Sequence, residues 1–447
     1  MLRKIWEMGI QWTRNLKDKG AFHIVVGSVL TKVVGLVGSI LVVRLISKSE
    51  YGIYGYYENL NSYLLIFLGF GLSTGLLRYL VIAEDGCKRD CFLFSIRRGS
   101  AWNVLIVLAG AALMLFYPHR EVFAPYRAVG VLLVLCLPFT FFQYTGLDAL
   151  RALFNNKGYA WASFLAAFVL ISFRLIGAKL GSVYTLTGAR LAAEILVGLG
   201  CVFFAYRQLM RTESGRNRIS EAFRRDFTRY SWQVMLTDGL WTMFMLNDVL
   251  ILGQLVGSET MVADYNVAYV IPSNLSIFTV SISIFVGPFF TKHEHEGDYV
   301  WVRQNFFRVL LANIGIMAAE VLVCLVLARP LIVLLYTEEY LSSVPIMRVL
   351  LAASFMNYGV RATVASILSS IGKQRINLIV AGIGIAVQIT LDILLIGRLG
   401  AIGLALASTL VHLVMGTILL VYFIRYLNRS IAEAEYRRPY SEGADGE

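Results

Sequence analysis

The chain is organised as long apolar runs separated by short polar connections. Helices that cross a hydrocarbon core need about 20 mostly apolar residues. Twelve runs meet this length, at residues 22–46, 55–82, 100–117, 128–147, 158–178, 182–206, 228–254, 263–290, 308–328, 345–370, 376–397 and 401–424. The runs are too long, and lack the alternation, for membrane-spanning strands. The pattern therefore predicts an all-α polytopic membrane protein with about 12 transmembrane helices.

The second half of the chain repeats features of the first. NNKGYAWASFLAAFVLISFRLIGAKLGSVYTLTGARLAAEILVG resembles GKQRINLIVAGIGIAVQITLDILLIGRLGAIGLALASTLVHLVMG, each with a basic turn, a span, a Gly turn and another span. Two lobes of six helices in the same orientation form a parallel repeat, which is typical of transporters. The predicted parts are an amphipathic cytoplasmic N-terminal segment (1–21), an N-lobe (22–206), a cytoplasmic linker (207–227), a C-lobe (228–426) and a cytoplasmic tail (427–447).

Composition and charge agree with this pattern. Hydrophobic residues make up 57% of the chain and charged residues 15%, against about 25% charged residues in an average soluble protein. The formal net charge is +11, and most Lys and Arg lie in alternate connections between the runs. Basic connections face the cytoplasm, so both termini are predicted to be cytoplasmic. No basic groove or RNA-binding motif accompanies the charge, and we expect no nucleic-acid partner.

Motifs of catalysis and metal binding are not found in the sequence. Cys87 and Cys91 are four residues apart, but two thiolates do not complete a zinc site. The run HEHE at 293–296 is not the H-E-x-x-H motif, because a glycine follows it. The chain also has no P-loop and no nucleophile elbow. We therefore expect no catalytic residue, no metal and no cofactor, and we do not expect an enzyme.

Short motifs mark the first two spans and the region of the seventh and eighth. They are Gly27-Ser28, Arg44, Glu50-Tyr51-Gly52, Phe70-Gly71-Leu72 and Arg78-Tyr79-Leu80, and then Asp248, Leu252-Gly253, Asp264-Tyr265, Ala268 and Pro288-Phe289. With these motifs the chain resembles polysaccharide-transporter flippases of the multidrug/oligosaccharidyl-lipid/polysaccharide superfamily. The motif match is strongest over residues 27–80, and the hydropathy match covers nearly the whole chain.

This resemblance implies a function and a location. It implies a flippase that moves an isoprenyl-diphosphate-linked oligosaccharide, an O-antigen (lipopolysaccharide) or exopolysaccharide repeat unit, across the inner membrane by alternating access. The implied location is the cytoplasmic membrane of a bacterium or archaeon, and polysaccharide polymerases and glycosyltransferases are candidate partners. Related lipid II flippases usually have two additional C-terminal helices, so the twelve-span count favours an O-antigen or exopolysaccharide unit over lipid II.

Two other functions are weighed against the flippase. A multidrug exporter of the same superfamily would favour acidic and aromatic cavity residues over intramembrane cations. A polysaccharide polymerase or ligase would need a long outer loop with catalytic Arg or His, and the longest predicted outer segment, at about 329–345, is short and largely apolar.

Four basic residues within or at the ends of spans are the predicted substrate-binding residues. Because a diphosphate headgroup is anionic, Lys and Arg in a wet cleft would offset the cost of moving it through the bilayer. Lys32 lies near the middle of its span and Arg361 in the inner half of its span. Arg44 and Arg78 lie nearer the faces of the membrane, where snorkelling to the interface is the alternative.

Asp238 and Glu194 are the predicted ion-coupling residues. Asp238 lies near the middle of the seventh span, where it is a candidate for a coupling proton or sodium ion. The alternative role of Asp238 is an ion pair with Lys32. Glu194 follows Arg190 by one helical turn, and the alternative for these two is a structural ion pair. Arg174, Asp248 and Asp392 are further charged residues, placed toward the outer face, and Glu320 lies in the middle of the ninth span.

Overall fold

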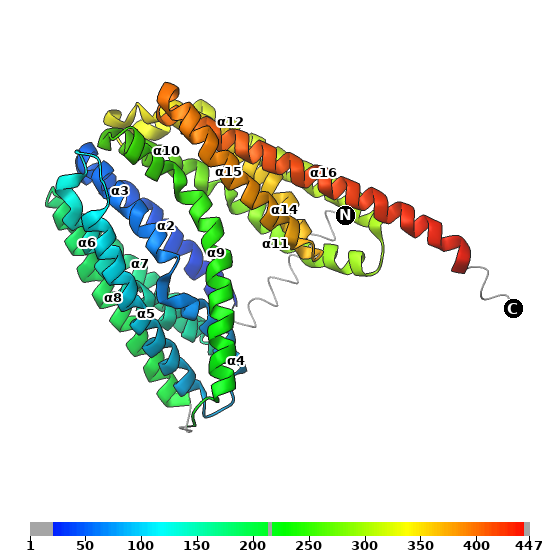
Figure 1. The fold of residues 1–447 in the computed structure, drawn as a ribbon, viewed down its shortest axis with the longest axis horizontal. Coiled ribbons are helices and arrows are strands. Elements are labelled where there is room, and N and C mark those ends of the chain that lie inside the picture. The colour runs from blue at the N-terminus through cyan, green and yellow to red at the C-terminus, as the bar shows by residue number, and fades with distance from the viewer. Residues whose placement is uncertain (1–20, 213–216, 442–447) are drawn as a thin grey trace. The chain divides into compact units, whose positions relative to one another are not determined.

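All regular structure in the described part of the chain is helical. The computed structural model describes residues 21–212 and 217–441 (Figure 1). The chain divides into two compact units, Met1–Leu246 and Asn247–Glu447. Unit 1 contains α2 (Ala21–Leu45), α3 (Lys48–Leu65), the short helix η1 (Leu68–Gly71), α4 (Leu72–Ile82), α5 (Lys88–Phe116), the short helix η2 (Ala124–Tyr126), α6 (Arg127–Ala152), α7 (Asn156–Lys179), α8 (Val183–Thr212) and the first part of α9 (Glu221–Leu255).

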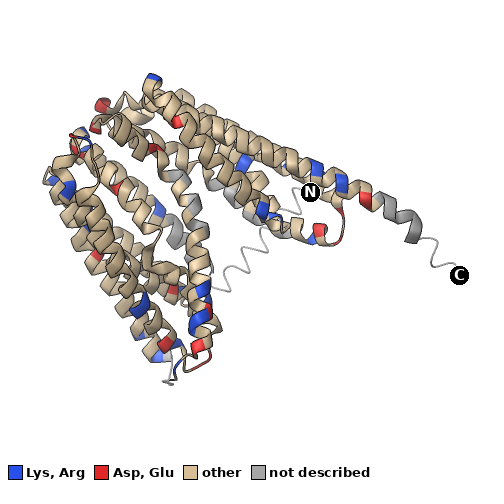
Figure 2. Cartoon of the chain, viewed as in Figure 1, with Lys and Arg blue, Asp and Glu red and all other residues tan. Residues whose placement is uncertain are grey.

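Unit 2 begins inside α9 and is built in the same way. Its helices are α10 (Glu259–Asn274), α11 (Ser276–His295), α12 (Tyr299–Leu335), the short helix η3 (Glu338–Tyr340), α13 (Ser343–Ser354), the π-helical turn η4 (Phe355–Arg361), α14 (Ala362–Ser370), α15 (Gln374–Leu399) and α16 (Ala401–Ser441). Figure 2 shows, within each unit, long stretches of helix without charge and a concentration of Lys, Arg, Asp and Glu toward helix ends.

Nine helical stretches of the described residues are long and apolar enough to cross a membrane, and each overlaps one predicted span. They are Lys48–Ile82, Lys88–Phe116, Ala124–Ala152, Asn156–Lys179, Val183–Arg211, Tyr299–Leu335, Ser343–Ser370, Gln374–Leu399 and Ala401–Ala434. The three other predicted spans, 22–46, 228–254 and 263–290, fall on α2, on α9 and on α10 with α11. These three regions include side chains outside the described set.

The internal packing of the two units supports the predicted parallel repeat. In unit 1, α6 is the central helix and packs against α4, α5 and α8. In unit 2 the same position is taken by α13, η4 and α14, which together pack against α10, α11, α12 and α16. The fifth and sixth spans of each six-span repeat, α7 with α8 and α15 with α16, pack as a hairpin across a short turn. Each unit thus places its fourth span against its second, third and sixth.

The described part of the predicted linker 207–227 is mostly helical. α8 extends to Thr212 and α9 begins at Glu221, so both ends of the predicted linker 207–227 continue the flanking helices. Hydrogen bonds from the Asn217 N–H to the Gly86 carbonyl, at 3.0 Å, and from the Ile219 N–H to Asp90, at 3.0 Å, join the described end of the linker to unit 1. The division between the units falls inside α9, and the predicted lobe boundaries stay a prediction.

The second span is broken in its middle by η1. Gly69, Phe70 and Gly71 have φ values of 55°, 59° and 70°. Residues other than glycine seldom adopt this left-handed conformation, so Phe70 is held there by its surroundings. The N–H of Gly69 donates to the Oδ1 of Asn103, on α5, at 2.8 Å. This side-chain acceptor replaces a helical hydrogen bond that the break removes.

Two glycines allow α6 and α8 to approach closely. A Cβ added at Gly198 of α8 would lie 2.4 Å from the carbonyl oxygen of Phe139, and one added at Gly146 of α6 would lie 2.6 Å from the backbone of Cys201. Both obstacles are backbone atoms, which cannot move aside as a flexible side chain can. Small residues at such positions are the usual means of close helix packing in membranes. The α6–α8 contact is therefore tightly specified.

A valine at Gly198 is expected to destabilise unit 1, because it must separate α8 from α6. Overpacking of this kind costs about 1–3 kcal/mol. Gly200 is the matched control, because it lies on the same helix and a Cβ there would meet nothing within 4 Å. Thermal unfolding in detergent should show a lower Tm for Gly198→Val and almost no change for Gly200→Val. Equal Tm values for the two variants would contradict the close-packing assignment.

Candidate functional site

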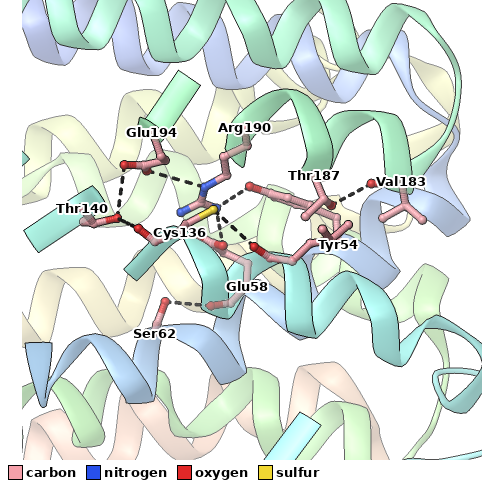
Figure 3. Close-up of polar contacts among 10 residues, drawn as sticks. Tyr54, Glu58, Ser62, Cys136, Thr140, Val183, Thr187, Arg190 and Glu194 are labelled. Atoms are coloured by element: carbon pink, nitrogen blue, oxygen red, sulfur yellow. Dashed lines mark hydrogen bonds and ion pairs between the residues drawn. The ribbon is translucent and has the colours of Figure 1, made fainter. Parts of the chain in front are cut away.

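A buried network of charged and polar side chains lies in unit 1 (Figure 3). Its centre is Arg190 of α8, whose side chain is 12% exposed. Arg190 donates through Nη1 to the hydroxyl of Tyr54, at 2.6 Å, and forms an ion pair with the carboxylate of Glu58. Tyr54 and Glu58 lie one turn apart on α3, so the guanidinium joins α8 to α3.

Glu194 extends this network to α6. Its Oε1 lies 3.9 Å from the Nε of Arg190, and its Oε2 accepts a hydrogen bond of 3.2 Å from the Thr140 hydroxyl. The side chain of Glu194 is 6% exposed. Arg174 of α7 adds a second guanidinium, 5.6 Å from the centre of the Tyr54 ring. The predicted Arg190–Glu194 pair is thus part of a larger set of two carboxylates and two guanidinium groups, and Glu58 holds Arg190 more closely than Glu194 does.

A different cluster, centred on Asp248, is buried in unit 2. One carboxylate oxygen of Asp248, on α9, accepts hydrogen bonds from the Tyr265 hydroxyl and from the Ser408 hydroxyl, the latter at 2.9 Å. The other oxygen lies 3.1 Å from the Nε2 of Gln388. The donors come from α10, α15 and α16, so this carboxylate is a point at which four helices of unit 2 meet.

Gln388 connects Asp248 to a second carboxylate. Its Nε2 lies 2.9 Å from Asp392 Oδ1, and the Nδ2 of Asn247 donates to Asp392 Oδ2 at 3.1 Å. Asp392 is fully buried, and the Oε1 of Gln388 is buried with no hydrogen-bond partner. Two carboxylates bridged by one amide, with hydroxyl and carbonyl oxygens beside them, are chemically suited to a proton or to a hard cation. Within the described residues, no cluster of three or more His, Cys, Asp or Glu is found.

Sequence reasoning noted Asp248 and Asp392 as intramembrane charges but did not pair them. A partial signal was present, because Gln388 and Asp392 are one turn apart on α15 and so share a face. The participation of Asp248 depends on the packing of α9 against α15, which no local pattern reveals.

Arg361 is the predicted substrate-binding residue that the structure buries. It lies at the end of the π-helical turn η4, is 8% exposed, and donates through Nε to the Oδ1 of Asn357 at 2.6 Å. π-helical turns inside helices are often found at functional sites. The turn η4 packs against both α12 and α16.

The other predicted cations lie in unit 1 and are exposed. Lys32 and Arg44 are on α2, and Arg78, on α4, places its guanidinium 4.8 Å from the centre of the Tyr230 ring. Arg361 belongs to unit 2, so the cleft that these four residues are predicted to share stays a prediction. The side chain of Asp238 lies outside the described residues, and its coupling role also stays a prediction.

A pocket of about 730 Å³ within unit 2 lies beside the broken tenth span. α11 and α14 supply its lining, which is Ser283, Gly287, Thr291, Lys292, Ser366, Ser369 and Ser370. Five hydroxyl side chains and one ammonium group therefore face one space. Hydroxyls suit the hydroxyl groups of a sugar, and an ammonium group suits a phosphate.

Solved structures of other membrane proteins share the fold of this chain. A multidrug resistance MATE family transporter of the MOP superfamily, in an inward-facing conformation, matches with a TM-score of 0.73 and 15% identity, over 90% of this chain and 96% of the transporter. The lipid II flippase MurJ, in an inward closed conformation, matches with a TM-score of 0.71 and 15% identity, over 90% of this chain and 87% of the flippase. The chain is thus a polytopic membrane protein with the two-lobe, twelve-helix fold of this superfamily, as the sequence predicted.

The sequence comparisons identify the family. The model of the polysaccharide biosynthesis protein family matches residues 18–294, and the chain belongs to this family. An uncharacterized membrane protein of Methanocaldococcus jannaschii is 23% identical over 426 residues, which cover 86% of this chain and 78% of the relative. The resemblance to polysaccharide transporters drawn from the motifs is therefore confirmed.

Removal of the Arg190 guanidinium is expected to destabilise unit 1 strongly. Arg190→Gln leaves Glu58 and Glu194 without their shared cation, and an uncompensated buried charge costs about 3–5 kcal/mol. Glu58→Gln combined with Arg190→Gln should melt at a higher temperature than Arg190→Gln alone. The control is Arg151→Gln, because the Arg151 side chain is 42% exposed and such a pair contributes about 1 kcal/mol or less. A Tm for Arg190→Gln equal to that of the control would show that the network does not stabilise the unit.

Proposed function

We propose that the protein is a flippase that moves an isoprenyl-diphosphate-linked oligosaccharide, an O-antigen or exopolysaccharide repeat unit, across the cytoplasmic membrane. The observation that carries this proposal is the tenth span of the chain, which is formed by α13, η4 and α14 of unit 2. Its middle holds the buried guanidinium of Arg361, and its last part lines the pocket of five hydroxyls and Lys292. The tenth span and α11 together thus offer cations for a diphosphate and hydroxyls for a sugar.

Membership of the polysaccharide biosynthesis family supports a saccharide substrate. The MurJ structure of the same fold is named a lipid II flippase, which supports the transport of a lipid-linked molecule. Lys32, Arg44 and Arg78 are the proposed further contacts for the diphosphate. Because a bare diphosphate would be prohibitively costly in hydrocarbon, each step of its passage needs a cation or water beside it.

The MATE transporter of the same fold keeps a multidrug exporter as the second candidate. The acidic cluster of Asp248 and Asp392 would suit organic cations. A buried arginine would repel such substrates, and the family match concerns polysaccharide biosynthesis, so the flippase is favoured. A polymerase or ligase is the least favoured function, because the matching structures are a transporter and a flippase.

An ion is proposed to drive the cycle by binding one state of the protein better than another, which is the only way that a ligand can shift an equilibrium. The Asp248–Asp392 pair is the leading site, since its recorded partners are all neutral donors. A proton or a sodium ion would complete its charge balance. Glu194 is the second site, and Asp238 is retained from its position in the sequence.

Loss of Arg361 should abolish flipping without loss of the folded protein. Arg361→Ala and, separately, Lys32→Ala remove a proposed contact with the diphosphate. The assay follows a fluorescent isoprenyl-diphosphate sugar in proteoliposomes, and ethidium uptake is measured in parallel. Arg398→Ala is the control, because Arg398 is an exposed residue at the end of α15. Full flipping by both variants, or ethidium uptake without flipping, would contradict the proposed substrate.

Neutralising the carboxylate pair should uncouple transport from the ion gradient. Asp248→Asn and Asp392→Asn keep the shape of the side chain but remove the charge that an ion would balance. Each variant should still bind the lipid-linked sugar, and its transport rate should no longer change when a proton or sodium gradient is imposed. Asp238→Asn and Glu194→Gln test the other two sites, and Asp226→Asn, at an exposed position of α9, is the control. A wild-type gradient response in both pair variants would assign coupling elsewhere.

A further inference from the structure

A pocket also lies in unit 1, and none of its lining residues belongs to the network around Arg190. Its volume is about 710 Å³, and α5, η1 and the first part of α9 supply its lining. The lining residues are Phe70, Phe94, Arg98, Trp102, Glu221, Arg224, Arg225, Thr228, Arg229 and Trp232. We call it the arginine–tryptophan pocket.

Two helical stripes face this pocket. The α9 residues lie at positions 221, 224, 225, 228, 229 and 232, which is the i, i+3, i+4, i+7 pattern of one helix face. The α5 residues Phe94, Arg98 and Trp102 are each one turn apart. Residues at these intervals lie on one face of a helix. The pocket is therefore formed along two helix faces, and its residues are not a chance collection from mobile loops.

Aromatic rings form one side of the pocket. The ring of Phe70 lies 5.0 Å from Trp102, edge to face, and 5.0 Å from Trp232, stacked. The indole N–H of Trp102 donates to the carbonyl of Phe67, before the break, at 2.8 Å. The left-handed conformation of Phe70 is thus what presents its ring between the two tryptophans. Strained conformations of this kind are often found at binding sites.

Four arginines give the pocket a strong positive charge, which one lining glutamate only partly offsets. Arg224 is paired, with Asp90 at 3.3 Å and with Glu221 at 3.0 Å. The structure records no ion pair for Arg98, Arg225 or Arg229 with any described residue. All three are exposed. Three guanidinium groups without an acidic partner therefore face the same space as an aromatic wall.

The pocket lies at the end of unit 1 that is predicted to be cytoplasmic. The first half of α5 and the first turns of α9 form it, and the linker and the loop before α5 are joined there through Asn217 and Gly86. Basic pockets between transmembrane helices on the cytoplasmic side bind the headgroups of anionic lipids. Tryptophan is enriched at the same level of the membrane, because its ring is apolar and its N–H is polar.

We propose that the arginine–tryptophan pocket binds the phosphate-bearing headgroup of a membrane lipid, with Arg98, Arg225 and Arg229 on the phosphate and the aromatic wall against the first part of the lipid chain. Guanidinium groups bind phosphate through two parallel hydrogen bonds. Two lipids carry this chemistry: an anionic glycerophospholipid, and an isoprenyl diphosphate of the kind in the proposed substrate. The site does not depend on flipping, because lipid binding is measured without transport.

The test uses four soluble probes on the full-length protein in a neutral detergent. They are dioctanoyl phosphatidylglycerol, farnesyl diphosphate, zwitterionic dioctanoyl phosphatidylcholine and inorganic pyrophosphate. Binding is read as the ligand-dependent rise in Tm, which gives an apparent Kd. Arg98→Gln with Arg229→Gln removes two phosphate contacts. Arg97→Gln with Arg218→Gln is the charge-matched control, because both residues are exposed near the pocket but do not line it.

At least one of the two anionic lipids should bind, about ten-fold more tightly than phosphatidylcholine or pyrophosphate, and Arg98→Gln/Arg229→Gln should weaken it about ten-fold. The control pair should stay within about two-fold. Arg98→Lys/Arg229→Lys keeps the charge and should show an intermediate loss, because the ammonium group cannot form the double contact. Tighter binding of farnesyl diphosphate would assign the pocket to the isoprenyl lipid, and tighter binding of phosphatidylglycerol would assign it to a membrane phospholipid.

The proposal is overturned if pyrophosphate binds as tightly as the lipids, since the aromatic wall would then have no role. It is also overturned if the two Gln pairs weaken binding equally, because the effect would then be one of net charge. Failure of flipping with intact lipid binding would contradict the proposed function alone.

Discussion

The cost of a charge in the hydrocarbon core is the constraint on which this structure depends. An ionised side chain inside a span must be paired, hydrogen-bonded or hydrated, since hydrocarbon offers it no partner. In unit 1 the pairing is done by Arg190, which contacts Tyr54 and Glu58 and lies near Glu194. Tyr54 and Glu58 lie on α3, and Glu194 accepts a hydrogen bond from Thr140 of α6. Neutralising the charge of Arg190 therefore also determines how α3, α6 and α8 pack. The same side chains therefore determine both the ion pairs of unit 1 and the packing of its helices.

Unit 2 satisfies the same constraint with different chemistry. The recorded partners of Asp248 and Asp392 are hydroxyl and amide donors, and none is a cation. A network that contains its own guanidinium groups is already balanced, whereas two carboxylates that share an amide gain from a further positive charge. The repeat thus provides two copies of one scaffold with unequal sites. This difference is the reason why the proposed ion site is placed in unit 2 before unit 1.

Interruptions in the helices occur where the chain presents unusual side chains. The break at η1 turns Phe70 toward Trp102 and Trp232, and the π-helical turn η4 carries Arg361 into the protein interior. Backbone of this kind is tolerated in a membrane only where protein groups replace the lost hydrogen bonds. Asn103 does this for Gly69. At Gly146 and Gly198, by contrast, α6 and α8 are regular helices that pack so closely that a larger side chain would not fit between them. Regular helices hold each lobe together, and the interruptions carry the side chains that are proposed to bind ligands.

The sequence by itself determined the class of the protein. Nine of the predicted spans are confirmed by helices of sufficient length, because an apolar run of about 20 residues has few alternatives to a membrane helix. The repeat and the family also followed from local motifs. Local pattern was enough to flag Arg361, Glu194 and Asp248, because an ionised group inside an apolar run is costly until it finds a partner. The partners of these charges were decided by tertiary structure alone. Glu58 meets Arg190, and Gln388 joins Asp248 to Asp392, across helices that are distant in sequence. A hydrogen bond depends on which helix faces pack together, and that is a property of the whole lobe.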